Sequence, residues 1–313
     1  MKNCLFCYKP VDLDGKDFHA FCSKQIFGQP SPPVLPYSEE DLEALAQEVI
    51  RSQTAVAGVQ AKLSLQISSN SRAGTERRFT LVGLWGGYIL KPPAMQYPQL
   101  PEVEDATMHL AEIAKIKTAP HSLVRLKSGN LGYVTKRIDR TYRGKLAMED
   151  MCQLTERLTE DKYQGSYEQI AKVIQRYSAT PGLDLVNFFE LLLFSFLTGN
   201  ADMHLKNFSL LEQPGIGMVF SPAYDLVNTA LVNPDDKEEM ALTLNGRKKK
   251  LKKQDFVAAM NMAKIDRKQQ ENIFAKMAKA LPQWLELIDR SFLTDEFKEG
   301  YKIILTERTG RVL

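Results

Sequence analysis

The sequence predicts an α+β fold with two lobes, a small β-rich N-terminal lobe and a larger, mostly helical C-terminal lobe. Short runs in which apolar and polar residues alternate occupy 56–91, whereas apolar residues at helical spacing dominate from Glu149 onward. The chain has 313 residues, more than a single hydrophobic core usually organises. We expect three parts: an N-terminal segment at 1–36, the β-rich lobe at 37–140 and the helical lobe at 141–313.

The β-rich lobe should begin after the proline-rich stretch 28–36, because proline favours extended backbone and lacks the amide donor that a helix needs. Ser38 is a suitable helix cap, and apolar residues from Leu42 to Ile50 then recur at helical spacing. A second helix is predicted at 102–116. Strands are predicted at 56–65, 78–82, 87–91 and 132–138.

The helical lobe contains one segment that is apolar on nearly every side. Phenylalanine and leucine fill most positions of 183–198, as expected for a helix buried on all faces. This helix leads directly to Asn200 and Asp202, so these polar side chains should lie at the end of a rigid element. Further helices are predicted at 151–158, 167–177 and, with interruptions, 254–297.

Charge and hydropathy limit the classes of function. The formal net charge of +3 is too small for nucleic-acid binding by bulk electrostatics, although a basic run stands at 247–253. Such a run most often forms a solvated face, and the alternative is a docking patch for tRNA or an acidic partner. No window approaches about 18 consecutive apolar residues, and the first residues do not resemble a secretion signal. We therefore expect a cytoplasmic protein without direct membrane contact.

Three of the four cysteines stand within the first 22 residues. Cys4 and Cys7 form a Cys-x2-Cys pair, and His19 and Cys22 form a His-x2-Cys pair. A turn at each pair could present three thiolates and one imidazole to a tetrahedral Zn²⁺ ion. The alternative is a small hairpin of reduced cysteines, since intracellular thiols pack as small apolar groups. Both interpretations stay open at the level of sequence.

A carboxylate, an amide and a second carboxylate stand close together in the helical lobe. Asn207 follows Asp202 by five residues, and Asp225 comes 18 residues later, beyond a predicted short hairpin. A phosphoryl-transfer site requires one base for an incoming hydroxyl and two oxygen ligands for Mg²⁺. Each acid alone could equally cap a helix or form a surface ion pair. The three together, between apolar blocks, favour a phosphotransferase site.

Five sequence blocks carry a resemblance to a known family. They are 58–65 (GVQAKLSL), 89–92 (ILKP), 136–140 (KRIDR), 199–208 (GNADMHLKNF) and 223–226 (AYDL). Their order is that of the HipA-type serine/threonine kinase toxins, and the chain resembles this family from about residue 50 onward. It is most similar to the short HipT toxins of HipBST systems, in which a separate HipS protein supplies a subdomain that HipA carries itself.

The resemblance implies a two-lobed protein-kinase-like (HipA-like) fold with ATP bound between the lobes. It implies a toxin that phosphorylates a serine in an aminoacyl-tRNA synthetase, the tryptophanyl enzyme for HipT, and so halts translation. It also implies HipS-like and HipB-like antitoxin partners, with nucleic acid contacted only through the HipB-like protein. Two alternatives from other classes are a small-molecule kinase and a catalytically silent binding protein.

The resemblance also assigns roles to residues. Asp202 would be the catalytic base, and Asn207 and Asp225 would hold Mg²⁺ on the nucleotide phosphates. His204 would hydrogen-bond within the catalytic loop, in a structural role rather than as a proton shuttle. Lys91 would contact the α- and β-phosphates, since a cation at the end of an apolar strand needs an anionic partner.

Other nucleotide contacts are expected from the β-rich lobe. Glu104 would orient Lys91, with Glu102 as a competing candidate. The backbone from Lys136 to Ile138 would contact adenine.

The phosphate-covering loop is expected at Ala57, Gly58 and Val59, where exposed amides can bind phosphate. The chain departs here from the family, whose members carry serines in this loop that are autophosphorylated to stop the kinase. Ala55 and Ala57 cannot accept phosphate. Either Ser52 and Thr54, just upstream, take that role, or the alanines are introduced changes that lock one state.

Overall fold

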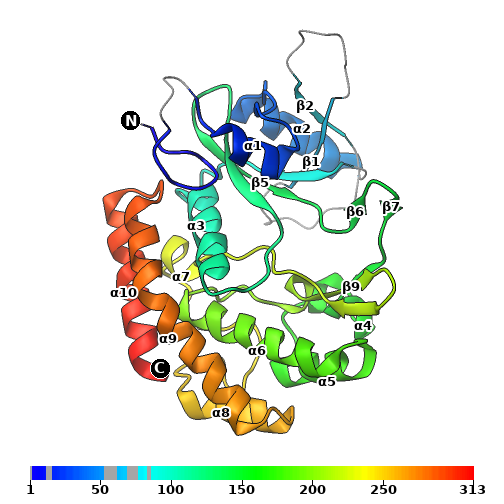
Figure 1. The fold of residues 1–313 in the computed structure, drawn as a ribbon, viewed down its shortest axis with the longest axis vertical. Helices are drawn as coiled ribbons and strands as arrows, with labels where there is room; N and C mark the ends of the chain where they lie inside the picture. Colours follow the sequence, from blue (N-terminus) through cyan, green and yellow to red (C-terminus); the bar gives the residue numbers. More distant parts are fainter. Residues whose placement is uncertain (1, 12–15, 53–61, 69–76, 83–85) are drawn as a thin grey trace. The chain divides into compact units, whose positions relative to one another are not determined.

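The computed structural model describes residues 2–11, 16–52, 62–68, 77–82 and 86–313. The chain divides into two compact units, which Figure 1 shows as a ribbon. The first unit comprises 1–105, 119–138 and 290–292, and the second comprises 106–118, 139–289 and 293–313. Strands dominate the core of the first unit and helices dominate the second, which confirms the predicted α+β class.

The first unit is built on a five-stranded antiparallel sheet in the order β2-β1-β3-β5-β4. β3 lies at the centre, and its last residue, Lys91, pairs with Tyr133 of β5. β4 was not predicted, because it begins with two polar residues, His121 and Ser122, whose side chains are buried. The strands are β1 (Leu63–Ile67), β2 (Phe79–Leu81), β3 (Tyr88–Lys91), β4 (His121–Arg125) and β5 (Leu131–Lys136).

Helices α1 and α2 and the start of α3 belong to the same unit. The predicted cap at Ser38 is confirmed, since the Ser38 hydroxyl accepts from the Asp41 amide and the Asp41 carboxylate accepts from the Ser38 amide. α1 was not predicted and ends at Gly28, whose φ of 73° is the left-handed conformation common at helix ends. The helices are α1 (Ala20–Phe27), α2 (Glu39–Ser52) and α3 (Leu100–Ile113).

The N-terminal residues share a core with the sheet. The ring of Phe27 lies 5.4 Å from that of Phe18 and 5.7 Å from that of Phe79, both edge-on. Such aromatic pairs contribute about 0.5–1.5 kcal/mol beyond the area they bury. The proline-rich stretch is tied to the sheet as well, because Val34 donates to the carbonyl of Arg77 and accepts from the amide of Phe79.

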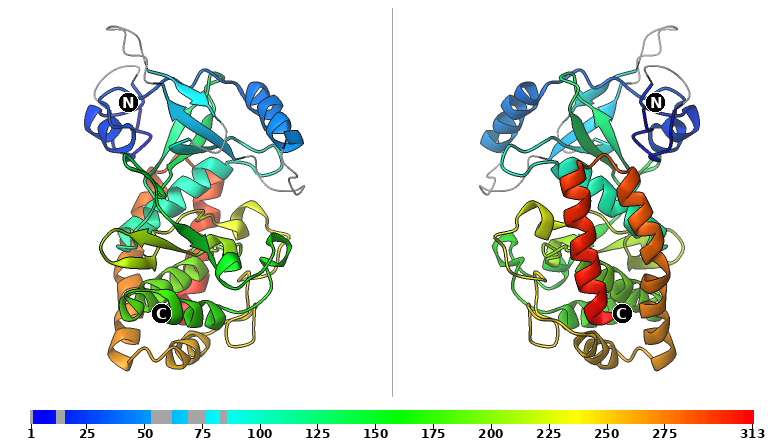
Figure 2. Two further views of the ribbon diagram at one scale, coloured as in Figure 1. Left: turned by 90° about the vertical axis from the view of Figure 1, so that its right-hand side faces the viewer. Right: turned by 90° about the vertical axis from the view of Figure 1, so that its left-hand side faces the viewer.

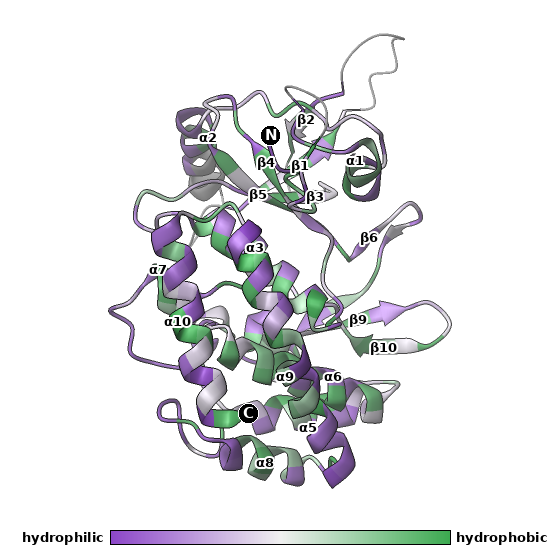
Figure 3. Ribbon diagram, turned by 60° about the vertical axis from the view of Figure 1, so that its left-hand side comes forward, coloured by the Kyte–Doolittle hydropathy of each residue, from purple (hydrophilic) through white to green (hydrophobic). Residues whose placement is uncertain are grey.

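The second unit is organised around α6 (Pro181–Leu197), which is buried along most of its length, as its composition predicts. Figure 3 shows the apolar residues, in green, along this helix. Phe194 of α6 packs edge-on against Trp284, with ring centroids 5.6 Å apart. The other helices of this unit are α4 (Met151–Leu154), α5 (Tyr167–Tyr177), α7 (Thr229–Val232), α8 (Lys253–Met262), α9 (Arg267–Arg290) and α10 (Asp295–Val312).

Three predicted helical segments differ in extent, and the one expected at 102–116 already ends at Ile113. The helix expected at 151–158 ends at Leu154, because Glu156 has a left-handed φ of 56° that cannot continue the helix. The segment 254–297 is divided among α8, α9 and the start of α10. Figure 2 shows α9 and α10 running side by side along this unit.

The second unit also contains a small antiparallel sheet in the order β10-β9-β8. The polar loop that contains Asp202 and Asn207 connects α6 to β9 of this sheet. β9 (Ser209–Gln213) and β10 (Gly217–Phe220) form the predicted hairpin, and β8 (Met148–Asp150) lies beside β9. A short ribbon pairs β6 (Arg140–Thr141) with β7 (Gly144–Lys145). Within the described residues, every helix is too short or too polar to cross a membrane.

Candidate active site

The loop that carries Asp202 starts from a sharply ended helix. At the C-terminus of α6 the Gly199 amide donates to the Phe196 carbonyl at 3.2 Å, and the Asn200 amide donates to the Ser195 carbonyl at 2.9 Å. These bonds form a Schellman motif, and Gly199 has the left-handed φ of 78° that the motif requires. The end of the apolar helix therefore fixes where the polar loop begins.

Gly199 also permits a close approach by Asn228. A Cβ atom at position 199 would lie 2.3 Å from Oδ1 of Asn228, much closer than carbon and oxygen can pack. Asn228 is held in place because its Oδ1 accepts from the Leu231 amide at 3.0 Å. The Thr229 hydroxyl accepts from the Ala201 amide at 2.8 Å. The segment after the hairpin thus braces the beginning of the loop.

Asp202 and Asn207 are joined by a direct hydrogen bond. The Asn207 side-chain nitrogen donates to the backbone carbonyl of Asp202 at 2.8 Å, and Asn207 is only 6% exposed. Because that nitrogen is used, Oδ1 is the end of the amide that remains for a cation. The Asp202 amide in turn donates to Oδ1 of Asn200 at 3.2 Å.

A tyrosine contacts the proposed base directly. The Tyr163 hydroxyl donates to Oδ1 of Asp202 at 2.7 Å. Its ring lies edge-on to that of His204, with centroids 5.0 Å apart. Burial raises the pKa of the Tyr163 phenol, and the Asp202 carboxylate adds to the shift, so the hydroxyl stays protonated at neutral pH.

The segment that carries Asp225 is hydrogen-bonded to the loop of Asp202 through the neighbouring residue Tyr224. The Tyr224 hydroxyl lies 2.5 Å from Oγ of Ser209 and donates to the Lys206 carbonyl at 3.1 Å. The Lys206 ammonium is fixed by an ion pair with Asp150 at 2.8 Å. Asp225 itself has a left-handed φ of 56°, a conformation that costs a non-glycine residue about 1–3 kcal/mol and is found more often at functional sites.

His204 is buried near both carboxylates. Burial lowers its pKa, while the negative charges of Asp202 and Asp225 oppose the shift. The imidazole is therefore neutral at pH 7. His204 bonds within the loop through its backbone, since its amide donates to the Asp202 carbonyl at 2.8 Å. Within the described chain its Nδ1 atom has no hydrogen-bond partner.

The oxygen donors of Asn207 and Asp225 suit a small, hard divalent cation. Mg²⁺ prefers oxygen ligands and is usually held by one or two carboxylates together with substrate phosphates. The Asp225 carboxylate and Oδ1 of Asn207 are oxygens of this kind. The residues present therefore fit Mg²⁺.

Lys91 of the first unit forms a buried ion pair with Glu104. Its Nζ atom lies 2.5 Å from Oε1 of Glu104, and the two side chains are 5% and 3% exposed. The ammonium also lies 5.5 Å from the centroid of the Tyr133 ring, at the distance of a cation–π contact. Of the two candidate glutamates it is Glu104, and not Glu102, that contacts Lys91.

Of the remaining predicted nucleotide contacts, the structure describes the adenine contact at 136–138. The amides of Lys136 and Arg137 donate to the carbonyls of Pro120 and Gly87 and so belong to the sheet. Ile138 follows them as the last residue of the predicted adenine contact. Ala57, Gly58 and Val59, together with Thr54 and Ala55, lie outside the described residues.

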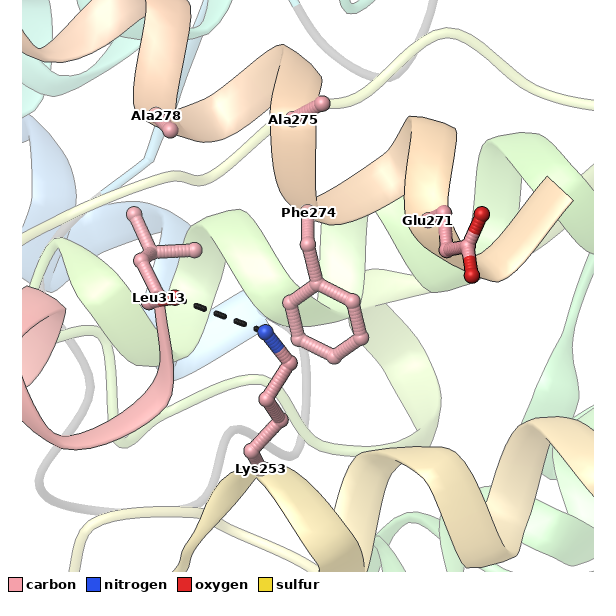
Figure 4. Close-up of a pocket in the computed structure, with 6 residues that line it drawn as sticks. All are labelled: Lys253, Glu271, Phe274, Ala275, Ala278 and Leu313. Atoms are coloured by element: carbon pink, nitrogen blue, oxygen red, sulfur yellow. Dashed lines mark hydrogen bonds between the residues drawn. The ribbon is translucent and has the colours of Figure 1, made fainter. Parts of the chain in front are cut away.

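The cysteine-rich segment and the basic run belong to different units. Cys4, Cys7, His19 and Cys22 come together in the first unit, with their ligand atoms within 4.8 Å of one another. In the second unit Lys253 donates to the Leu313 carbonyl at 3.4 Å, so one end of the basic run packs internally. Figure 4 shows this lysine in a surface pocket lined by Lys253, Glu271, Phe274, Ala275, Ala278 and Leu313. The pocket contains none of the predicted site residues.

Two tyrosines at the site were not predicted. Tyr163 stands in an irregular segment without a motif, and nothing in a single sequence marks it. Tyr224 is part of the block 223–226, but its role in tying two loops together appears only in the fold.

Comparisons with known proteins show what the chain is similar to. The sequence matches the HipA-like C-terminal domain family over residues 54–285. It is 35% identical over 186 residues to a Sinorhizobium fredii protein named "Putative kinase Y4dM", a match that covers 56% of this chain and 44% of that protein. "Putative kinase Y4mE" of the same species is 31% identical over 202 residues, covering 61% of this chain and 46% of its own length. The chain thus spans about half the length of these curated relatives.

A solved structure shows the same fold. A chain from the Shewanella oneidensis MR-1 toxin antitoxin complex of HipA, HipB and operator DNA matches with a TM-score of 0.68 and 23% identity. The match covers 90% of this chain and 72% of that one. This likeness confirms the fold predicted from the sequence. Because the family match extends over most of its length, the chain belongs to the HipA-like C-terminal domain family.

Proposed function

We propose that this chain is an ATP- and Mg²⁺-dependent protein serine/threonine kinase that acts as the toxin of a toxin–antitoxin system. The observation that carries the proposal is the constellation of Asp202, Asn207 and Asp225. Asp202 and Asn207 are hydrogen-bonded to each other, and Asp225 lies close enough to affect the same histidine as Asp202. A base and two cation ligands on loops anchored to a buried helix are the parts that phosphoryl transfer needs.

In the proposed reaction Asp202 orients a serine or threonine hydroxyl of the acceptor. A bond forms between the hydroxyl oxygen and the γ-phosphorus of ATP, the bond from that phosphorus to the β,γ-bridging oxygen breaks, and ADP leaves. The hydroxyl proton passes to Asp202. Asn207 and Asp225 would hold Mg²⁺, which supplies neutralisation of the developing phosphate charge when bound. His204 stays neutral, packs beside Asp202 and keeps a structural role.

In the first unit we propose Lys91 as the contact to the α- and β-phosphates. Its ion pair with Glu104 supports this role, because the pair holds a buried ammonium in one orientation. We propose the backbone at Ile138 as the adenine contact, since the amides of Lys136 and Arg137 are used in the sheet. The resemblance assigns the phosphate-covering loop to 57–59.

We propose an aminoacyl-tRNA synthetase, and most specifically the tryptophanyl enzyme, as the protein substrate. The support is the resemblance of the five sequence blocks to the short HipT toxins. HipS-like and HipB-like antitoxins are the proposed partners, and the Shewanella complex, in which HipA is found with HipB and operator DNA, supports the second of them. Contact with nucleic acid would then be made by the HipB-like partner, in the cytoplasm.

The proposal is tested by incubating the purified chain with γ-labelled ATP and Mg²⁺ in a cell extract. We expect one labelled protein that carries phosphoserine or phosphothreonine, identified by mass spectrometry. Label should be absent with Asp225→Ala and present with the control Asp295→Asn, because the Asp295 side chain is fully solvent-exposed. Label confined to small molecules would make the chain a metabolite kinase, and no label with the unmodified chain would contradict a kinase.

A further inference from the structure

Four side chains with metal-binding groups converge at the N-terminus, and the proposed kinase reaction uses none of them. Cys4 and Cys7 flank a tight turn, and His19 and Cys22 stand at the start of α1. The three sulfur atoms and one imidazole nitrogen all lie within 4.8 Å of one another. Four ligands of this kind at this separation are what a closed, structural metal site offers.

The separations of Nδ1 of His19 from two of the sulfur atoms agree with tetrahedral Zn²⁺. Nδ1 of His19 lies 3.5 Å from Sγ of Cys7 and 3.6 Å from Sγ of Cys22. Zinc bonds of about 2.3 Å to sulfur and about 2.0–2.1 Å to nitrogen, at tetrahedral angles, place such ligand atoms about 3.5–3.6 Å apart. The imidazole of His19 therefore lies at the distance from two of the sulfur atoms that a shared zinc ion would impose.

The imidazole of His19 is oriented for metal binding. Its Nε2 atom lies 2.9 Å from the carbonyl oxygen of Pro10. Because a carbonyl only accepts hydrogen bonds, Nε2 must carry the proton, and the lone pair of Nδ1 then faces the sulfur atoms. A backbone carbonyl that fixes the tautomer in this way is the usual outer contact of a metal-bound histidine.

Reduced thiols alone account less well for this arrangement. Nδ1 has a single lone pair, so only one of the thiols of Cys7 and Cys22 can donate a hydrogen bond to it. Cys4, the third member, is fully buried. All four cysteines of the chain lie among the described residues and none forms a disulfide. One cation bound by the deprotonated thiols satisfies the whole cluster.

The segment that carries the cysteines is docked on the β-rich unit. The Ser122 hydroxyl of β4 is shared between two carbonyl oxygens, that of Leu123 at 2.9 Å and that of Leu5 at 3.2 Å. Asp17 receives two hydrogen bonds of 2.9 Å from the Arg125 guanidinium, the paired geometry that is strongest for arginine and carboxylate. The cluster is therefore held against the edge of the sheet at β4.

Tyr8, next to Cys7, connects the cluster to α3. Its hydroxyl donates to Oδ2 of Asp105 at 2.6 Å, and Oδ1 of the same carboxylate lies 2.7 Å from Nδ1 of His121. Asp105 is completely buried. It directly follows Glu104, the partner of Lys91 in the buried ion pair.

We propose that Cys4, Cys7, His19 and Cys22 bind one structural Zn²⁺ ion, and that this zinc site fixes Tyr8 against Asp105 and thereby positions the turn of α3 that carries Glu104. The zinc site stands independently of the proposed kinase activity. Because Glu104 positions Lys91, we expect the zinc site to affect nucleotide binding as well. That second effect rests on the proposed function.

The zinc site is tested by metal analysis of the full chain purified without chelators. We expect about one equivalent of zinc, with X-ray absorption showing three sulfur ligands and one nitrogen ligand. The variant Cys7→Ser should lose zinc, whereas Cys152→Ser, which changes the cysteine outside the cluster, should keep it. Zinc below about a tenth of an equivalent, or a shell of oxygen and nitrogen only, would overturn the site. Both measurements on the unmodified chain stand even if Cys7→Ser does not fold.

The coupling to α3 is tested with hydrogen exchange, which needs no ATP. The Tyr8→Phe variant should keep its zinc, but the amide hydrogens of α3 around Glu104 should exchange at least several-fold faster. The amide hydrogens of α9 should stay as protected as in the unmodified chain. The Kd for ATP should rise several-fold in the same variant. Tyr177→Phe, on an exposed face of α5, is the matched control. Unchanged exchange at α3 would contradict the coupling. A chain that holds zinc but binds no ATP would refute the kinase proposal alone.

Discussion

The hydroxyl of Tyr163 donates a hydrogen bond of 2.7 Å to Oδ1 of Asp202, the residue proposed as the catalytic base. A phenolic hydroxyl thus occupies one of the two carboxylate oxygens with which Asp202 could orient a serine or threonine hydroxyl. Tyr163 is 45% exposed, so it is not locked in place by the core. We infer that Tyr163 competes with the acceptor for Asp202.

Replacing Tyr163 with Phe should therefore raise the rate of phosphate transfer at low acceptor concentration. A hydrogen bond to a charged carboxylate contributes about 1.5–3 kcal/mol net, which corresponds to an increase of about tenfold to 150-fold. The rate is measured with the labelled acceptor well below saturation, and Tyr177→Phe is the control. A loss of transfer instead would mean that Tyr163 positions Asp202 rather than competing for it.

The Lys91–Glu104 pair should show strong coupling in a double-mutant cycle. Lys91→Met or Glu104→Leu alone removes one member of this buried ion pair, at a cost of about 3–5 kcal/mol in unfolding free energy. The double variant Lys91→Met/Glu104→Leu should recover most of that stability, because matched apolar residues need no partner. Denaturant unfolding of the four proteins measures the coupling. Purely additive effects would show that the pair contributes little.

Position 199 should tolerate only glycine. Alanine there must adopt φ near 78° and bring its Cβ against Asn228, so Gly199→Ala should lower the unfolding free energy by about 1–3 kcal/mol or more. Phosphate transfer should fall too, since the loop to Asp202 begins at this residue. Gly310→Ala, in α10 with open space around it, should instead stabilise the chain by about 0.5–1 kcal/mol. Similar stabilities of the two variants would contradict the described turn.

Glu102 should make stability depend on pH. Burial raises its pKa to about 7, from 4.5 for the exposed group, and the nearby Asp105 carboxylate adds to the shift. The folded state holds the proton more tightly, so this contribution to stability is complete below pH 4.5 and is lost as the pH rises through 7. Glu102→Gln should thus gain about 1–3 kcal/mol relative to the unmodified chain between pH 4.5 and pH 8.

This difference is measured by urea unfolding of both proteins at the two pH values. Glu43→Gln, on an exposed position of α2, serves as the control and should show no such change. An equal stability difference at both pH values would mean that Glu102 does not titrate in this range.

The elements that sequence predicted well are those with strong local signals. α5 matches its predicted range and α6 lies within a residue or two, because both carry apolar residues at helical spacing. The strand β4 was missed, because the partners of His121 and Ser122 come from distant parts of the chain. The helix after Met151 was predicted too long, because the left-handed φ of Glu156 has no marker in its residue type.

The same distinction between local signals and long-range contacts holds for the residues of the candidate site. The residues Asp202, Asn207 and Asp225 could be picked out because their types and spacing match one chemistry. The contact of Tyr163 with Asp202 spans 39 residues, and that of Tyr8 with Asp105 spans 97. Long-range contacts of single side chains leave no periodic signal, so only the fold reveals them.

The most direct test of the central claim is the rate of phosphate transfer from ATP to protein by the Asp202→Asn variant. Asparagine keeps the shape of the side chain but cannot take a proton, so transfer should fall by about 10²- to 10⁴-fold. The Asp295→Asn control should keep the rate of the unmodified chain. Transfer by Asp202→Asn at the unmodified rate would contradict the assignment of the base and, with it, the kinase mechanism proposed for this chain.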